Sequence, residues 1–361
     1  MKKRTKIAAL CLAAGLLVLG ISAVVIRGKS TDIYIDPVVM EEAMLEGEIT
    51  IISEGTAAVP LSDAAAVAAV PAAAPEAQPA APAAEAVQMT PEQTVTVLAA
   101  QASGVLQKVG NNAMIDYSNT SQGYVMVQYT QASSARLKVQ VKGPATTYTY
   151  NLTPQQWNVF PLSDGNGAYQ VSVFQNVSGN RYAQLLSAGF GVTLTDEFAP
   201  FIRPNQYVNY CAASLSVAVA AELTKTVTDP LQKVALVYDY VVSYLSYDKE
   251  KAATVASGYL PVLDQVLVAK KGICFDYAAL MTGMLRSQGI PCKLVVGYAG
   301  TAYHAWISVW TEQTGWIDGA IYFDSKTWHR MDPTFASSGK KSASIMKYIG
   351  DGTNYTTKYL Y

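Results

Sequence analysis

Apolar and polar residues alternate over short stretches in the middle of the chain. Five segments between Tyr124 and Phe174 are rich in β-branched and aromatic residues, and turn residues such as those of 163–168 separate them. A period of two predicts β-strands, and strands at intervals of about ten residues are typical of a small β-sandwich, here over roughly 110–197. The predicted strands are 124–130, 136–142, 146–150, 157–160 and 169–174.

The segment before this sandwich has a different pattern. Thr90 and Pro91 have the residue types of an N-cap and a first helical position, and an apolar run continues to about Val109. We therefore expect a short helix that leads into the sandwich.

Helical periodicity returns after Pro204. Asp229 is a favourable N-cap, Pro230 suits the first helical position, and apolar residues recur every three or four positions from Leu231 to Leu245. This pattern predicts a helix that packs one face against a core.

A second helix is predicted to begin at Cys274. Apolar residues follow at helical spacing, namely Ala278, Met281 and Leu285, and Gly289 has the residue type that commonly ends a helix. The positive end of the helix dipole and the two lysines just before the helix would favour a thiolate at this position. Cys274 is therefore a candidate nucleophile.

A thiol nucleophile needs a proton carrier, and the chain has two histidines, His304 and His329. His304 lies in an alternating segment, 303–310, which predicts a strand. It is the candidate base for Cys274.

Two further strands are predicted over 316–323 and 327–333. A period of two places Asp332 and His329 on opposite faces of the second strand. We expect His329 to be a structural or surface residue. Asp332 can thus lie beside the predicted base and the helix of Cys274. Nucleophile, base and orienting acid are the three residue types that thiol catalysis requires.

Composition narrows the chemistry. The 26 basic and 27 acidic residues give a formal net charge of −1, so no positive surface for nucleic acid is indicated. The four cysteines show no CxxC spacing, and no calcium-loop pattern is present, so we expect neither a metal nor an organic cofactor. Cys211 and Cys292 are expected to be buried thiols.

The N-terminal residues have the features of an export signal. Four basic side chains precede an uncharged run, 7–26, that is long enough to cross a bilayer. An uncleaved membrane anchor and a cleavable signal peptide both stay open, and either places the rest of the chain outside the cytoplasm, membrane-anchored or secreted. From Ala57 to Ala86 alanine and proline dominate, which favours an extended spacer.

These patterns divide the chain into four parts. Residues 1–29 are the predicted signal peptide or membrane anchor, and residues 30–88 are an Ala/Pro-rich, mostly disordered linker. Residues 89–200 are the β-sandwich domain with its short leading helix. Residues 201–361 are the domain that contains Cys274.

Three motifs in a fixed order, GICFDYA around Cys274, YHAWISVW around His304 and RMDPTF around Asp332, resemble the transglutaminase core domain of the transglutaminase-like superfamily. The resemblance covers roughly 230–335 and includes the Tyr247-Asp248 pair before the cysteine helix. It implies an α+β, papain-like core with the cysteine helix on an antiparallel sheet, here preceded by an all-β, immunoglobulin-like sandwich. It also implies that Cys274 is the nucleophile, His304 the base and Asp332 the orienting acid.

The family includes protein cross-linking enzymes, peptidases, amidases and inactive relatives, so the resemblance indicates the chemistry better than the substrate. We expect a cysteine peptidase or amidase that acts on protein, peptide or cell-envelope amides. A cross-linking transglutaminase is one alternative, and a non-catalytic surface-binding module is another. The short connections 300–303, 312–315 and 324–326 leave little chain for a lid, which favours water over an amine as acceptor. The expected partners are a protein or peptide substrate and, if the N-terminal helix is kept, the membrane.

Overall fold

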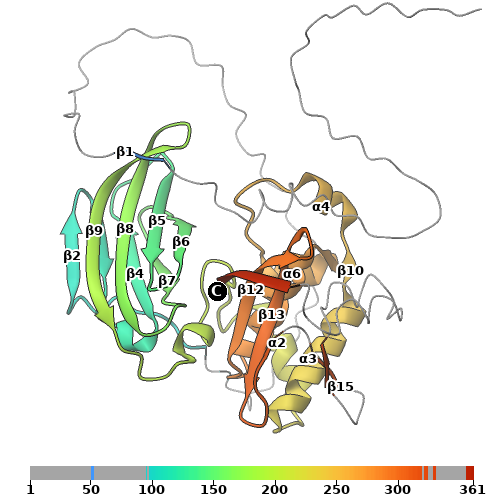
Figure 1. Cartoon of the computed structure of the whole chain (residues 1–361). Helices are drawn as coiled ribbons and strands as arrows, with labels where there is room; N and C mark the ends of the chain where they lie inside the picture. The colour runs from blue at the N-terminus through green and yellow to red at the C-terminus, as the bar shows by residue number, and fades with distance from the viewer. Residues whose placement is uncertain (1–49, 53–94, 96, 319–320, 324–327, 331–354) are drawn as a thin grey trace, which may run out of the picture. The chain divides into compact units, whose positions relative to one another are not determined.

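A computed structural model describes residues 50–52, 95, 97–318, 321–323, 328–330 and 355–361 (Figure 1). The predicted export signal, most of the predicted linker and Asp332 lie outside the described residues. Within the described residues, no helix has the length and apolar character needed to cross a membrane.

The β-strands described before residue 193 form two sheets (Figure 1). The larger has the strand order β1-β9-β8-β5-β6, antiparallel except for the parallel pair β1–β9, and the smaller has the antiparallel order β2-β3-β4-β7. The strands of the larger sheet are β1 (Thr50–Ile52), β5 (Leu137–Lys142), β6 (Thr147–Asn151), β8 (Gly167–Ser178) and β9 (Arg181–Val192). The strands of the smaller sheet are β2 (Gln107–Gly110), β3 (Ala113–Asp116), β4 (Tyr124–Tyr129) and β7 (Trp157–Pro161).

Alternate residues of these two sheets share one hydrophobic core. Val139 on β5 and Val127 on β4 are completely buried, and the rings of Tyr150 on β6 and Phe160 on β7 lie 4.9 Å apart. Each of the five strands predicted from alternation is present as β4, β5, β6, β7 or β8, which confirms those strands. The immunoglobulin-like topology stays a prediction.

The predicted helix before the sandwich is wrong for the residues that the structure describes. Residues 97–103 have neither helical nor strand structure, and Gln107–Gly110 form β2, paired with β3. Gly104 has φ +73°, and its N–H donates to Asp116 Oδ2 at 2.6 Å. Long-range hydrogen bonds therefore use the backbone groups that a helix would pair, and they override the local preference.

Helices dominate the chain between residues 215 and 286. The α-helices described are α2 (Leu215–Thr224), α3 (Pro230–Tyr244), α4 (Lys249–Thr254), α5 (Leu263–Ala269) and α6 (Cys274–Arg286). The start of α3 is confirmed, because Asp229 accepts a hydrogen bond from the Leu231 N–H at 3.0 Å. The start of α6 at Cys274 is confirmed too, and Gly289 follows it at φ +74°. Burial of α6 is not limited to one face, since all its residues are buried.

Another sheet, separate from the two above, has the antiparallel order β14-β13-β12-β17 (Figure 1). The helix α6 packs against β12 and β13 of this sheet. The strands of the sheet are β12 (Cys292–Ala299), β13 (Ala302–Thr311), β14 (Gly315–Asp318) and β17 (Tyr355–Leu360). The predicted strand 316–323 is divided, because β15 (Ile321–Phe323) pairs with β16 (Trp328–Arg330) rather than continuing β14. The strand β17 was not predicted.

A tyrosine cluster joins the two sheet regions. The ring of Tyr361 lies 4.1 Å from that of Tyr207 and 5.9 Å from that of Tyr150 on β6. The buried guanidinium of Arg286, at the end of α6, donates to the Tyr361 carbonyl at 2.6 Å. Residue 361, next to β17, is thereby fixed to α6 on one side and to β6 on the other.

Candidate active site

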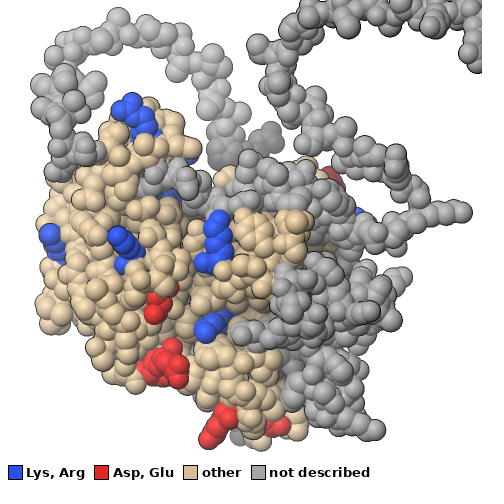
Figure 2. All heavy atoms as spheres, viewed as in Figure 1, with Lys and Arg blue, Asp and Glu red and all other residues tan. Residues whose placement is uncertain are grey.

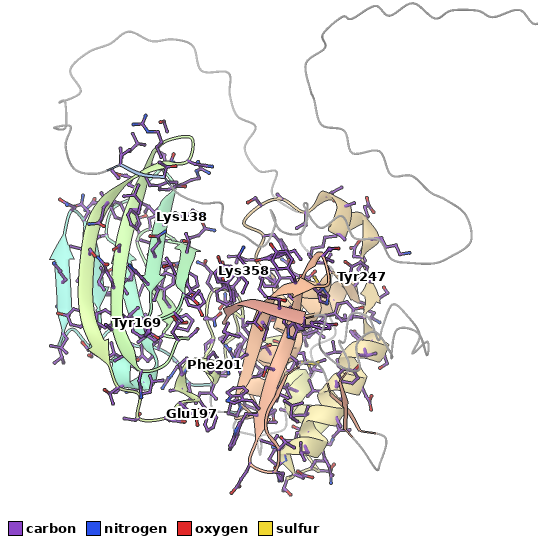
Figure 3. The ribbon with its side chains drawn as sticks, viewed as in Figure 1. Lys138, Tyr169, Glu197, Phe201, Tyr247 and Lys358 are labelled. Carbon is purple, nitrogen blue, oxygen red and sulfur yellow. The ribbon has the colours of Figure 1, made fainter. Side chains whose placement is uncertain are left out.

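Cys274 is the first residue of α6 and is completely buried. The preceding strand β11 (Lys271–Gly272) pairs in parallel with β10 (Ser246–Tyr247), and the Asp248 N–H donates to the Gly272 carbonyl at 2.9 Å. Tyr247, labelled in Figure 3, is therefore part of the element that holds the approach to Cys274.

A buried carboxylate lies two residues after Cys274. Asp276 is inaccessible to solvent, and its Oδ2 accepts from the Ile273 N–H at 2.8 Å and from Lys251 Nζ at 2.7 Å. Its Oδ1 accepts from the Tyr259 hydroxyl at 2.5 Å. Burial, together with the charge of Asp276 and this hydrogen bond, raises the pKa of Tyr259 well above its ordinary value, so Tyr259 stays a proton donor.

Asp248 connects the same region to α4. Its carboxylate caps α4 by accepting from the Lys251 N–H at 3.0 Å, and Lys271 Nζ lies 3.0 Å from its other oxygen. Partial burial alone would raise the pKa of Asp248, but these hydrogen bonds and the nearby lysine charges lower it. Sequence reasoning noted the Tyr247-Asp248 pair without this role.

His304 lies on β13, directly opposite Gly297 on β12, and is 1% exposed. Its ring stacks with that of Trp306 at 6.3 Å, and the ring of Tyr355 on β17 lies 6.5 Å away. A Cβ on Gly297 would lie 3.0 Å from Trp306 Cη2 and 2.0 Å from the Thr356 carbonyl oxygen. The glycine therefore provides the space in which Trp306 and β17 approach β12.

Tyr355 was missed by sequence reasoning. Its ring lies 5.1 Å from that of Trp306, so β17 supplies one side of the surroundings of His304. Lys358 on the same strand, labelled in Figure 3, lies 6.0 Å from the ring centroid of Tyr298. The β-branched and aromatic residues of 355–361 are a strand signal, but the sequence does not indicate which strand they join.

The structure brings together the elements that carry two of the three candidate residues. Cys274 begins α6, His304 lies on β13, and α6 packs on β13. Asp332 lies outside the described residues, so the triad stays a prediction. His329 is on β16, where its backbone is paired with Tyr322.

The remaining described cysteines differ from each other. Cys292 is completely buried, its thiol donates to Thr282 Oγ1 at 3.6 Å, and burial raises its pKa to about 11. Cys211 is exposed, so the prediction of a buried thiol there is wrong. It lies in the turn before α2, where its N–H donates to Ser214 Oγ at 3.0 Å, and a turn at the surface leaves its side chain in solvent.

Charged side chains are sparse on the face shown in Figure 2, where the Lys and Arg side chains of the described residues are separated from one another. Among the described residues, no group of three or more His, Cys, Asp or Glu side chains is arranged to hold a metal ion.

The fold is a mixed α+β structure in which a buried helix begins with a cysteine and packs on an antiparallel sheet that carries a histidine. Residues 217–333 match the family model described as the Transglutaminase-like superfamily, and this range includes Cys274, His304 and Asp332. Residues 217–333 are therefore a transglutaminase-like core domain, which confirms the predicted family.

Two curated relatives show the extent of the similarity. A protein-glutamine gamma-glutamyltransferase from Pseudomonas aeruginosa is 30% identical over 115 residues, which are 28% of this chain and 17% of that protein. The uncharacterized protein Rv2569c from Mycobacterium tuberculosis is 35% identical over 75 residues, which are 17% of this chain and 23% of that protein. The chain thus spans less than a quarter of the length of either relative.

Solved structures give weaker matches. The periplasmic domain of TgpA from Pseudomonas aeruginosa has a TM-score of 0.30 at 16% identity, covering 67% of this chain and 99% of that chain. A candidate cysteine protease from Cytophaga hutchinsonii has a TM-score of 0.33 at 12% identity, covering 66% of this chain and 83% of that chain.

Proposed function

We propose that this protein is an extracytoplasmic thiol acyl-transfer enzyme that hydrolyses amide bonds of proteins, peptides or the cell envelope. The Cys274 thiolate attacks the amide carbonyl, and His304, oriented by Asp332, protonates the departing amine. Water then attacks the thioester carbonyl, releasing the carboxylic acid and restoring the thiol. The Cys274 N–H, among the first N–H groups of α6 and without an intrahelical acceptor, is the candidate oxyanion donor.

The position of Cys274 carries this proposal. A cysteine that only fills a core has no need of a helix start, whereas Cys274 begins a completely buried helix that packs on the strand of His304. The family match spans both residues and Asp332 as well. These three residue types in one transglutaminase-like domain support catalysis over a binding module.

The choice of water rather than an amine as the group that attacks the thioester rests on the turns at the ends of β13, the strand of His304. The β12–β13 connection turns at Gly300, with φ +63°, and the β13–β14 connection ends at Gly315, with φ +68°. Both are tight turns, so neither supplies a lid that would keep water from a thioester. This supports hydrolysis.

Transglutamination is the second candidate. The similarity to a protein-glutamine gamma-glutamyltransferase from Pseudomonas aeruginosa favours it, although the match covers 17% of that protein. The two candidates share the thioester and differ only in whether water or a primary amine resolves it.

One assay separates the candidates. The purified protein is incubated with a glutamine-bearing protein and a labelled primary amine at millimolar concentration, and cleavage, deamidation and amine incorporation are measured together. We expect cleaved or deamidated product with little incorporated amine, lost in Cys274→Ala and kept in the matched buried-thiol control Cys292→Ala. Predominant incorporation that depends on Cys274 favours transglutamination, and the absence of both products favours a binding module.

The other parts of the chain receive supporting roles in this proposal. Residues 1–29 act as a membrane anchor or a cleaved signal, and residues 30–88 as a spacer. Residues 89–200 form an immunoglobulin-like, non-catalytic module attached to the domain of residues 201–361. Detection of intact protein in the membrane fraction, against release of a shortened form, distinguishes an anchor from a signal peptide.

A further inference from the structure

The carboxylate of Asp276 is enclosed by three donors from three different segments. The Ile273 N–H belongs to the residue just before Cys274, Lys251 comes from α4, and Tyr259 comes from the loop between α4 and α5. Asp276 is fully buried, whereas the Lys251 side chain is 28% exposed. The network therefore runs from the protein surface to the start of α6.

The network also shapes the segment 272–273 that leads into Cys274. A Cβ on Gly272 would lie 2.6 Å from the Asp276 Cβ and 2.9 Å from its Oδ2, so the glycine allows the carboxylate to lie against the backbone. Ile273 has no side-chain acceptor to cap α6, and Asp276 provides the cap from within the first turn. The first helical hydrogen bond, from the Tyr277 N–H to the Ile273 carbonyl at 3.1 Å, starts at this fixed peptide.

We propose that Asp276 is a positioning residue of the acyl-transfer site, and that Lys251 balances its charge. Asp276 fixes the 272–273 segment, and thereby the direction of the thiol and the N–H of Cys274. Lys251 and Tyr259 fix Asp276. This inference rests on the proposed function and adds residues outside the triad to it.

The charge balance follows from the position of Asp276. A carboxylate two residues from a reactive thiol disfavours the thiolate, because like charges in a partly buried site repel each other. Lys251 Nζ at 2.7 Å cancels that repulsion while leaving the hydrogen bond to the Ile273 N–H in place. The other described charges nearby, Asp248 and Lys271, already form their own pair at 3.0 Å.

The test is the pH profile of Cys274 alkylation by iodoacetamide, followed peptide by peptide in the intact protein. Lys251→Met is expected to raise the pH of half-maximal alkylation by about one unit, because Asp276 keeps its charge through the remaining donors. Lys251→Arg keeps the positive charge and is expected to stay near the wild-type value. Lys225→Met is the matched control, since Lys225 pairs with Glu222 on an exposed helix surface.

Asp276→Asn supplies the opposite perturbation. It leaves Lys251 without its counter-charge, so half-maximal alkylation is expected at lower pH than in the wild type. Turnover is expected to fall about tenfold, because the 272–273 segment is held less firmly. The double variant with Lys251→Met is expected to return the alkylation profile to the wild-type position. A purely structural role would move both single variants in the same direction.

The outcomes separate the inference from the proposed function. If wild-type Cys274 does not react with iodoacetamide, the proposed function itself fails. If Cys274 reacts but Lys251→Met and Lys251→Arg have the same profile, the positioning and charge-balancing role is refuted. The Lys251 variants decide this even if Asp276→Asn does not fold, because Lys251 lies partly at the surface.

Discussion

Cys274 and Cys292 are matched in burial, since each is completely inaccessible to solvent, but the fold places them in different surroundings. Burial raises the pKa of Cys292 to about 11, so at pH 7 about 1 in 10,000 of these thiols is ionised. A free cysteine in solution has a pKa near ~8.5 and is therefore roughly 3% thiolate at the same pH. Cys292 should therefore alkylate about 300-fold more slowly than a free cysteine, before its burial slows the reagent further.

If Cys274 is the nucleophile, it should not behave like its buried counterpart. We expect it to alkylate at least as fast as Cys211 and more than about 100-fold faster than Cys292 at pH 7, because a helix start and His304 stabilise its thiolate. Native protein is treated with iodoacetamide for increasing times, quenched, digested and quantified by mass spectrometry for each cysteine peptide. His304→Ala should slow only the Cys274 peptide at pH 6–7.

Two results would refute this reasoning. Equal, slow labelling of Cys274 and Cys292 would mean that Cys274 is an inert core thiol, as buried cysteines usually are. Fast labelling of Cys274 that is unchanged in His304→Ala would keep the nucleophile but remove His304 as its base. Circular dichroism of the variant excludes unfolding as the cause of any change.

Three further predictions concern stability. Gly297→Ala should cost about 3 kcal/mol in urea denaturation, because its Cβ would lie 2.0 Å from the Thr356 carbonyl oxygen, whereas Gly191→Ala, with open space around it, should change stability by less than about 0.5 kcal/mol. Tyr150→Phe should raise the free energy of unfolding by about 1 kcal/mol, because no described residue forms a hydrogen bond with the buried Tyr150 hydroxyl. A decrease of that size in the variant would contradict this reasoning. The pKa of Asp248 is lowered in the folded protein, so its carboxylate contributes stability above about pH 4. In thermal melts, the difference in stability between the wild type and Asp248→Asn should shrink as the pH falls below that value. A difference that does not change with pH would exclude this linkage.

The elements that the sequence predicted correctly have local causes. The N-cap of α3 needs only Asp229 and the two residues after it, and the end of α6 needs only Gly289. Apolar and polar residues alternate along the strands β4 to β8 because one side of each strand faces a hydrophobic core. The two candidate residues within the described chain were placed on the predicted types of element for the same reason, Cys274 at a helix start and His304 on a strand.

The features that the sequence did not predict depend on partners far along the chain. The strand β17 is paired with β12, about sixty residues earlier, and no local pattern of 355–361 specifies that partner. The failed helix before β2 has the same origin, since Gly104 is held by Asp116 on β3. The exposure of Cys211 follows from the turn that precedes α2, which the apolar pattern does not encode.

Asp276 shows what a local pattern can hide. Its spacing from Ile273 is that of the acidic residue in a capping box, but the N-cap position holds an isoleucine rather than serine or threonine, so the usual signature is absent. Half of the motif suffices, because Asp276 caps the helix while Lys251 and Tyr259 compensate for burying its charge. A buried acid this close to a candidate nucleophile is costly for folding alone, since an apolar residue would fill the space without a charge to compensate. Under the proposed function, its presence is explained by the need to hold the first peptide of α6 in one orientation for the chemistry at Cys274.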